Sequence, residues 1–450
     1  MSAQIIPSRT AAEIALADAY GTAKSKLPGT AEVAKLREAA FASFNQAGLP
    51  HRRIETWHYT DLRSLMREAL PIAPAPGADA LASLGKTMRA AGLPAQSLVL
   101  VDGVFAPELS TKLPEGVKVS SLATVLGEGR SDVIAALSAE WIGTEDPIVA
   151  LNAALMQDGV VIDVAPGTKL AEPIHLIYAT VSATPVARFS RSLMLVGAGA
   201  AVQISEASFG AGGRKGQTNN ALIIVAGDAS DVGHTLSLTD AEPGSVRLES
   251  FMVKLGAKAH FDSFALITGA GLVRRQIFMR FDGADAKAAL RGVSLLRGRE
   301  HADTTLFVEH CATGCEGREN FRYILDDEAI GVFQGKIHVA PGAQKTDGKM
   351  LCKALLLTDQ VAMYSKPELE IFADDVVCGH GTTCGGLDED QLFYLQTRGL
   401  PFAEAEALLL DAFGGELVDE LAHEGLVTAF RAEIAAWLAE RSNAGQGAGR

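Results

Sequence analysis

Two residues with soft metal-binding side chains, Cys378 and His380, lie between glycines near the end of the chain, in the run Val-Cys-Gly-His-Gly. The residues before them read as an extended segment, and side chains two residues apart on a strand point to the same face. A thiolate and an imidazole on one face could ligate one iron or zinc ion, or the thiol could accept sulfur. A packed cysteine beside a surface histidine is the alternative, and the local sequence leaves both readings open.

A second cluster of potential ligands comprises His310, Cys311 and Cys315, with His301 nearby. Its spacing is looser than the Cys-x-x-Cys pairs of zinc sites, and no second such pair is present. We therefore interpret Cys311 and Cys315, together with Cys352, as packed and chemically inert thiols.

Paired carboxylates occur at Asp326-Asp327 and Asp374-Asp375, a residue type that glycoside hydrolases use in pairs. Adjacent residues on a strand point to opposite faces, so neither pair is expected to share one site. We predict solvated or turn-capping roles for them.

The chain also lacks a Walker A sequence, a complete dinucleotide fingerprint and a Gly-x-Ser-x-Gly elbow, which predicts that it binds no nucleotide by itself.

The charge balance excludes other classes of partner. The 450 residues carry a formal net charge of −14, which argues against a general surface for nucleic acid or anionic membrane. The local cluster of Arg274, Arg275 and Arg280 is too small to reverse this, and we interpret it as a solvated strand face.

An odd count of five cysteines without a secretory leader predicts free thiols in a reducing cytoplasm. No apolar run is long enough to span a membrane.

The periodicity divides the chain into helical ends and a β-rich middle. Residues 10–47 predict amphipathic helix, and Trp57 and Tyr59 in the segment 48–62 are interpreted as anchors to the core rather than as a ligand-stacking pair. The Pro-, Ala- and Gly-rich residues 71–95 read as a linker or irregular cover.

From about residue 97, short branched-aliphatic runs end in Gly, Asp or Pro, and helical windows are nearly absent between about 170 and 375. This pattern favours a β-solenoid, with a β-sandwich as the alternative because no strict repeat length is evident. Helices then return: Asp388 is a predicted N-cap for 389–398, and a second helix follows over 402–413. The apolar run 408–410 exceeds one core stripe, so either the small bundle or a partner buries it.

Several segments resemble the SufB/SufD family, the scaffold subunits of the Suf iron–sulfur cluster assembly machinery. The most specific match joins Lys-Pro-Glu-Leu-Glu-Ile at 366–371 to Ala-Asp-Asp-Val at 373–376, Cys378, His380-Gly381 and the run 386–395 with Arg398-Gly399. Upstream, the segments 331–337, 340–347 and 48–62 are similar to the SufD branch of this family.

This resemblance implies a right-handed parallel β-helix over 96–385, between an N-terminal helical domain with its linker (1–95) and a C-terminal helical domain (386–450). It also implies a non-catalytic scaffold that pairs with a SufB-like subunit through the β-helix. A SufC-like ABC-type ATPase would dock on the C-terminal helices and supply ATP hydrolysis.

Cys378 and His380 match the family's Cys-x-His, which implies a nascent-cluster site shared with SufB. Iron or a cluster would be held there only transiently, with no cofactor held stably by the isolated chain. Cys384 departs from the family pattern, and we interpret it as a packing residue. The alternative function is a stand-alone β-solenoid enzyme acting on carbohydrate, or a zinc-binding protein. The sequence leaves open a homodimer of the isolated chain, a flavin in the complex and the route by which iron enters.

Overall fold

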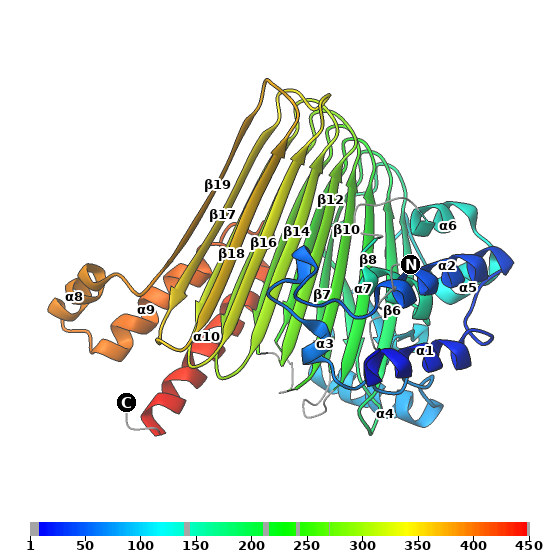
Figure 1. The fold of residues 1–450 in the computed structure, drawn as a ribbon, viewed down its shortest axis with the longest axis horizontal. Helices are drawn as coiled ribbons and strands as arrows, with labels where there is room; N and C mark the ends of the chain where they lie inside the picture. The colour runs from blue at the N-terminus through cyan, green and yellow to red at the C-terminus, as the bar shows by residue number, and fades with distance from the viewer. Residues whose placement is uncertain (1–8, 139–144, 210–215, 240–243, 270, 448–450) are drawn as a thin grey trace, which may run out of the picture.

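The computed structural model describes residues 9–138, 145–209, 216–239, 244–269 and 271–447. Its body is a parallel β-solenoid in which the chain alternates between two facing sheets (Figure 1). The ten-stranded sheet contains, in spatial order, β19 (Val377–Gly385), β17 (Asp347–Leu356), β15 (Glu316–Leu325), β13 (Lys287–Leu296), β11 (His260–Thr268), β9 (Asp231–Leu238), β7 (Ala201–Phe209), β5 (Ile174–Ala179), β1 (Ser97–Val101) and β2 (Val104–Phe105).

The facing nine-stranded sheet contains, in the same direction, β18 (Ala362–Ile371), β16 (Ile330–Val339), β14 (His301–His310), β12 (Leu272–Phe281), β10 (Val246–Leu255), β8 (Gln217–Ala226), β6 (Ala187–Val196), β4 (Val160–Val164) and β3 (Val117–Ser121). Among the described strands, only the β1–β2 and β3–β4 pairs are antiparallel. Each longer strand therefore pairs with the strand two positions away in the sequence, which confirms the predicted solenoid and rules out the sandwich.

The sequence adopts this coil because branched aliphatic residues face inward and corner residues accept a left-handed backbone. Interior residues in register stack in rows along the axis. From β12 to β16, residues in register on successive coils are 29 positions apart in the sequence. Corners are made at positive φ by Ala229, Lys258, Asp285, Asp327 and Lys345. Aspartate tolerates this conformation, which explains why Asp marks several strand ends.

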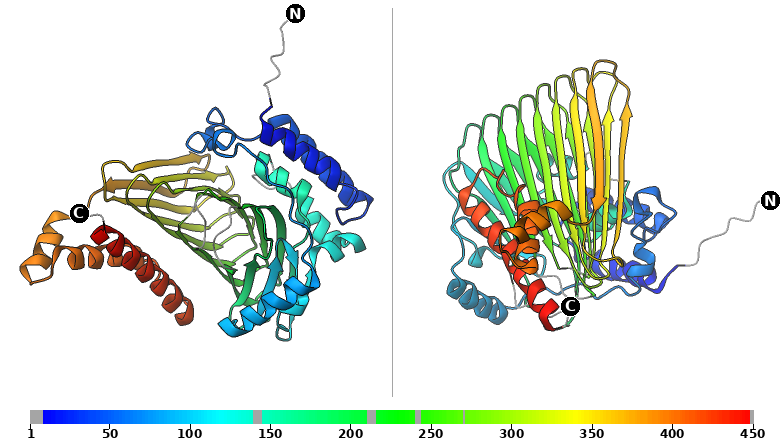
Figure 2. Two further views of the ribbon diagram at one scale, coloured as in Figure 1. Left: turned by 90° about the horizontal axis from the view of Figure 1, so that it is seen from below. Right: turned by 90° about the vertical axis from the view of Figure 1, so that its left-hand side faces the viewer.

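Helices cover the early end and one side of the solenoid (Figure 2). The first group comprises α1 (Ala11–Ala23), α2 (Ala31–Ala47), α3 (Leu62–Leu65), α4 (Ala78–Ala91), α5 (Leu122–Glu128), α6 (Ser131–Ser138) and α7 (Pro147–Leu155), with short 3₁₀ turns at Glu55–Trp57 and Pro107–Leu109. The second group comprises α8 (Glu389–Thr397), α9 (Phe402–Gly415) and α10 (Glu424–Gly447). Residues of α9 and α10 pack on the outer face of the ten-stranded sheet, for example Phe430 on Phe264. None of the helices among the described residues is long and apolar enough to cross a membrane.

The prediction that 71–95 is a linker or irregular cover is wrong for most of its length, because α4 occupies Ala78–Ala91. Gly77 and Gly92 bracket this helix, and Leu84 and Met88, four residues apart, bury one face of it. The alanines and glycines that suggested a linker lie among these apolar residues, and tertiary packing of the apolar face stabilises the helix.

The interpretation of the arginine cluster as a solvated strand face is also wrong for two of its members. Arg274 and Arg275 are each only 1% exposed, and only Arg280 is partly exposed. Arg274 forms a buried ion pair with Asp303, and its guanidinium lies 4.1 Å from the centroid of the Trp57 ring. Arg275 faces the interior, where it approaches the ring of Phe251. Charge pairing and aromatic contacts compensate their burial, and strand alternation alone could not reveal these partners.

The segment 51–62 crosses the outer face of the nine-stranded sheet and anchors there, as its aromatic residues predict. Trp57 is fully buried, and its Nε1 donates a 2.8 Å hydrogen bond to Asp146. Tyr59 stacks on Tyr364 of β18 with 4.8 Å between ring centroids. This segment therefore ties the N-terminal helices to the last coil of the solenoid.

Candidate functional site

Cys378 and His380 lie on β19, the last strand of the ten-stranded sheet, which pairs only with β17 (Figure 1). In register, Cys378 lies beside Gly348 and His380 beside Met350. Met350 is part of the buried core, so both residues face the interior side of this last coil. Cys378 is half-buried and packs against the core, whereas His380 is exposed. The structure therefore puts the two side chains on one face at an open end of the solenoid.

The opposite wall of this coil is β18, the last strand of the nine-stranded sheet. Its Ser365 is in register with the buried Phe333, and its hydroxyl accepts a 2.9 Å hydrogen bond from Thr382 of β19. Cys384, further along β19, is exposed and in register with Ala354. The last coil thus exposes a short row of thiol, imidazole and hydroxyl groups.

Electrostatics around Cys378 favour the neutral thiol. Burial raises the pKa of the Cys378 thiol, and the carboxylates of Asp347 and Glu319 raise it further, against a backbone hydrogen bond at Gly348 that lowers it. Asp375, three residues before Cys378, instead pairs with Lys345. A cation that binds here must therefore displace the thiol proton, because the thiolate is the ligating form.

Cys315 and Cys352 are packed thiols, as the sequence predicts, and Cys311 is partly packed, but the interpretation of Cys384 as a packing residue is wrong, because its side chain is exposed on the last strand, which no further coil covers in the described part of the chain. Cys315 and Cys352 are 0% and 1% exposed, and burial raises the pKa of the Cys352 thiol to about 12. Cys311 is half-buried, and burial together with Glu309 raises the pKa of its thiol to about 11. His301 lies apart from these thiols, with its Nε2 3.1 Å from the Thr60 hydroxyl.

The first carboxylate pair caps turns, in agreement with the prediction for it. Asp326 accepts from the Asp327 backbone amide and pairs with Arg441 at 2.6 Å. Asp327, at positive φ, accepts a hydrogen bond from the Gly298 amide at 3.0 Å. These carboxylates are therefore engaged in structure rather than gathered in one acid–base site.

Residues 9–138, 145–209, 216–239, 244–269 and 271–447 contain no group of three or more His, Cys, Asp or Glu side chains arranged to hold one metal ion. Cys378 and His380 thus supply at most two ligands. The side chains of two interior residues, His310 and Glu319, lie two coils inward from the last coil and have no hydrogen-bond partner among the residues that the structure describes. Strand alternation places Glu319 at an inward position, and that signal could have singled it out from the sequence.

Most of the exposed large apolar side chains among the described residues lie in two parts of the chain outside this row. The first, on the last coil, contains Tyr364, Ile371, Phe372 and Val377. The second, on α8 and α9, contains Phe393, Tyr394, Phe402 and Leu408. Leu408 is 51% exposed whereas Leu410 is fully buried, so the helical bundle covers only part of the apolar run 408–410.

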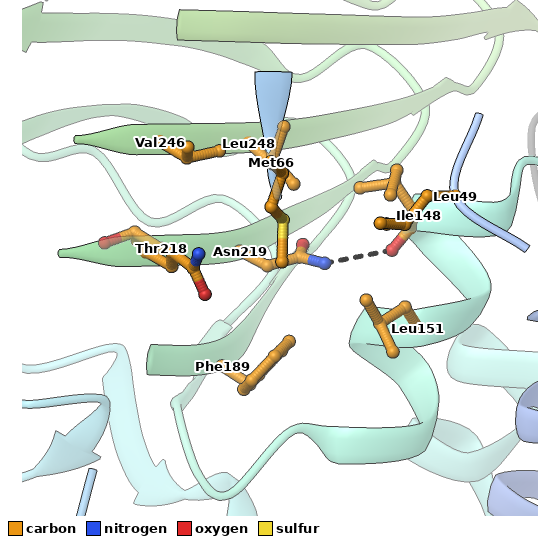
Figure 3. A pocket seen from close by; sticks show the side chains of 10 residues that line it. Leu49, Met66, Ile148, Leu151, Phe189, Thr218, Asn219, Val246 and Leu248 are labelled. Carbon is orange, nitrogen blue, oxygen red and sulfur yellow. Dashed lines mark hydrogen bonds between the residues drawn. The ribbon is translucent and has the colours of Figure 1, made fainter. Parts of the chain in front are cut away.

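An apolar pocket lies away from β18 and β19, at the seam between the N-terminal segments and the solenoid. Figure 3 shows Leu49, Met66, Leu151 and Phe189 around it, with the Asn219 amide donating a 3.1 Å hydrogen bond to the Ile148 carbonyl. The Asn219 amide nitrogen is satisfied within the protein, whereas Asn219 Oδ1 has no hydrogen-bond partner in the described part of the chain, and the apolar side chains of the lining belong to the core that joins the helices to the strands. The pocket is therefore a packing seam.

Comparison with known proteins shows similarity over most of the chain. Residues 178–413 match the family described as SUF system FeS cluster assembly, SufBD core domain, and residues 13–176 match the SufBD protein N-terminal region. The iron–sulfur cluster assembly SufBD family protein slr0076 of Synechocystis is 31% identical over 401 residues, covering 86% of each chain. The iron–sulfur cluster assembly protein SufD of Escherichia coli is 29% identical over 390 residues, which is 85% of this chain and 87% of that protein. The SufD protein of Bacillus subtilis is 26% identical over 291 residues, covering 63% of this chain and 64% of that protein.

Proposed function

This chain belongs to the SufBD family of iron–sulfur cluster assembly proteins, and on that premise we propose that it is a non-catalytic scaffold subunit of a Suf assembly complex. The observation that carries the proposal is the half-built site on β19. Cys378 and His380 share one face at an open strand edge, where a second subunit can supply further ligands.

The partner at this edge is a SufB-like subunit. The outer edges of β18 and β19 have no neighbouring strand within the described part of the chain, and unpaired strand edges favour β-strand addition. The exposed Phe372 and Val377, 60% and 63% accessible, border the same coil. Apolar contact beside new backbone hydrogen bonds would bury these side chains and hold the two half-sites together.

The ATPase partner docks on α8 and α9. Phe393, Tyr394, Phe402 and Leu408 are each more than half exposed, and the chain carries no Walker A sequence of its own. Because α9 and α10 pack on the solenoid wall, movement of a docked ATPase would be transmitted to the strands that lead to β19. ATP hydrolysis by the docked ATPase would thereby act on the cluster site.

At the site, His380 donates an imidazole nitrogen to iron or to the nascent cluster, with Cys378 as the neighbouring thiol. The exposed His380 is the side chain that a ligand from the partner can meet first, and the half-buried Cys378 lies two residues away on the same face of β19. Iron and sulfide are cargo here, held only while the complex is assembled.

The test is His380→Ala in a complex reconstituted with a SufB-like subunit and a SufC-like ATPase. We expect cluster formation, followed by visible absorption after anaerobic reconstitution, to fall strongly while the complex stays assembled. The matched control is Cys311→Ser, which changes a packed thiol outside the site and should have little effect. Unchanged cluster formation in the His380→Ala complex would remove His380 from its assigned role.

The partners have a separate test. Copurification should recover an ABC-type ATPase and a SufB-like chain with this protein. An isolated chain that degrades polysaccharide and recruits neither partner would overturn the scaffold proposal.

A further inference from the structure

Two polar residues interrupt apolar rows inside the solenoid, and both lie in the coil made by β14 and β15. The row that contains His310 has Phe281 on the preceding coil and Val339 on the next. The row that contains Glu319 has Leu290 before it and Met350 after it. His310 is 0% exposed and Glu319 is 1% exposed. The adjoining coils thus show that apolar residues suit both positions.

Neither side chain has a hydrogen-bond partner elsewhere in the described part of the chain. Both ring nitrogens of His310 and both carboxyl oxygens of Glu319 are buried and unsatisfied. The imidazole only stacks on Phe281, with ring centroids 4.3 Å apart. Arg318, the nearest cation in sequence, pairs with Asp347 instead. Leaving such groups unpaired is costly, so a chain that keeps two of them together calls for a ligand.

The two groups converge on the space beside Gly317. A Cβ atom at Gly317 would lie 2.9 Å from Glu319 Oε1 and 3.3 Å from His310 Nε2. Polar atoms from opposite sheets therefore approach one point, and they do so because Gly317 has no side chain there.

The same row continues without a side chain toward the edge of the solenoid. Gly317 is in register with Gly348, and Gly348 is in register with Cys378. A Cβ atom at Gly348 would make only ordinary contacts, at 3.6 Å from Cys378 Sγ and from Ile337, which indicates room for an atom of that size. Two coils correspond to roughly 10 Å along the axis. Cys378 thus lies at the outer end of a side-chain-free row whose inner end holds His310 and Glu319.

We propose that His310 and Glu319 form an interior binding site for one divalent transition-metal ion, two coils inward from Cys378. An imidazole nitrogen and a carboxylate oxygen suit Fe²⁺ or Zn²⁺, whereas Mg²⁺ and Ca²⁺ prefer oxygen ligands alone. The Glu319 carboxylate would balance one positive charge of the ion, and Cys378 adjoins the row from its outer end.

This inner site deepens the proposed function and rests on it for its purpose, since a scaffold that builds clusters at β19 needs iron close to Cys378. Its ligands are distinct from His380. Binding at the inner site and chemistry at the edge can therefore be measured separately.

The test is titration of the isolated full-length chain, with its thiols reduced, by Co²⁺ as a spectroscopic probe. We expect one equivalent to bind, with a ligand-field absorption band that excess Mg²⁺ does not remove. His310→Val and Glu319→Met place residue types from the adjoining coils at these positions. Changes outside the first ligand shell already cost about 10- to 100-fold in metal affinity, so each variant should weaken Co²⁺ binding at least tenfold.

Cys384→Ser, which changes an exposed thiol outside both proposed sites, is the matched control and should keep the wild-type affinity for Co²⁺. Thermal melts of His310→Val and Glu319→Met without metal should equal or exceed the wild-type melt, because each variant removes unpaired buried polar atoms. Glu319→Gln, which keeps the side-chain shape and removes the anionic ligand, should weaken binding as well and serves if Glu319→Met does not fold.

Three results would overturn the inner site. A wild-type chain that binds no Co²⁺ would leave His310 and Glu319 as a water-filled pair. Equal affinity in wild type, His310→Val and Glu319→Gln would place the ion elsewhere. Loss of binding in His380→Ala would place it at the edge. Cluster formation in the reconstituted complex is a separate measurement that tests the scaffold role, and none of these outcomes depends on it.

Discussion

The buried ion pair between Arg274 and Asp303 yields a quantitative prediction about the N-terminal segment. Arg274 and Asp303 have side chains 1% and 0% exposed, and Asp303 also accepts hydrogen bonds from Thr60 and Thr305. The other face of the arginine holds the segment 51–62, because Arg274 Nη2 donates a 2.7 Å hydrogen bond to the Thr56 carbonyl. The Asp303 carboxylate therefore neutralises the Arg274 guanidinium, to which the segment 51–62 is hydrogen-bonded.

Asp303→Asn keeps the shape of the side chain and removes its charge. Breaking a buried pair by removing one partner leaves a charge without compensation and costs about 3–5 kcal/mol. The amide oxygen can still accept one hydrogen bond, so we expect a loss of about 3 kcal/mol in the free energy of unfolding. The segment 51–62 should also loosen, since it depends on the position of Arg274.

Urea denaturation followed by circular dichroism measures the first effect, and hydrogen exchange of the peptide spanning 51–62 measures the second. Asp262→Asn is the control. Asp262 pairs with Arg291, which also pairs with Glu420 at 2.7 Å and so keeps a partner. We expect this control to cost less than about 1 kcal/mol. A loss below about 1 kcal/mol in Asp303→Asn, with unchanged exchange over 51–62, would refute the reasoning that this pair holds the segment.

Three further predictions concern titration, thiol reactivity and docking. Burial raises the pKa of Glu319 from 4.5 to about 8, so the folded state favours the neutral carboxyl group. The contribution of Glu319 to stability is therefore greatest below pH 4.5 and is lost as the pH rises toward 8. Glu319→Gln should remove that loss, on the order of a few kcal/mol, in urea denaturation curves at several pH values, and an unchanged pH slope would contradict it. Iodoacetamide should modify the exposed Cys384 well before the buried Cys315 and Cys352, as peptide mass spectrometry would reveal; equal rates would contradict their burial. Leu408→Glu should weaken ATPase binding at least tenfold in a titration without changing the thermal melt. Leu410→Glu, at a buried position, should instead destabilise α9 itself. Wild-type ATPase affinity in Leu408→Glu would place the docking surface elsewhere.

The sequence by itself determined much of the architecture, because several of its signals are local. Branched runs ended by Asp or Gly specify strand and corner without reference to the rest of the chain, and Asp388 caps α8 as predicted, with its carboxylate accepting from the amides of Asp390 and Gln391. Alternation along β19 likewise placed Cys378 and His380 on one face. Each of these inferences needs only neighbours within a few residues.

Only the tertiary structure decided what those faces meet. Arg274 reads as a surface residue until Asp303 and Trp57, from distant parts of the chain, are brought around it. His310 and Glu319 lie on opposite sheets, and only the coil register brings them together beside Gly317. The physical reason is that strand alternation specifies the side a residue faces, whereas the coil-to-coil register and the approach of the second sheet specify its partners.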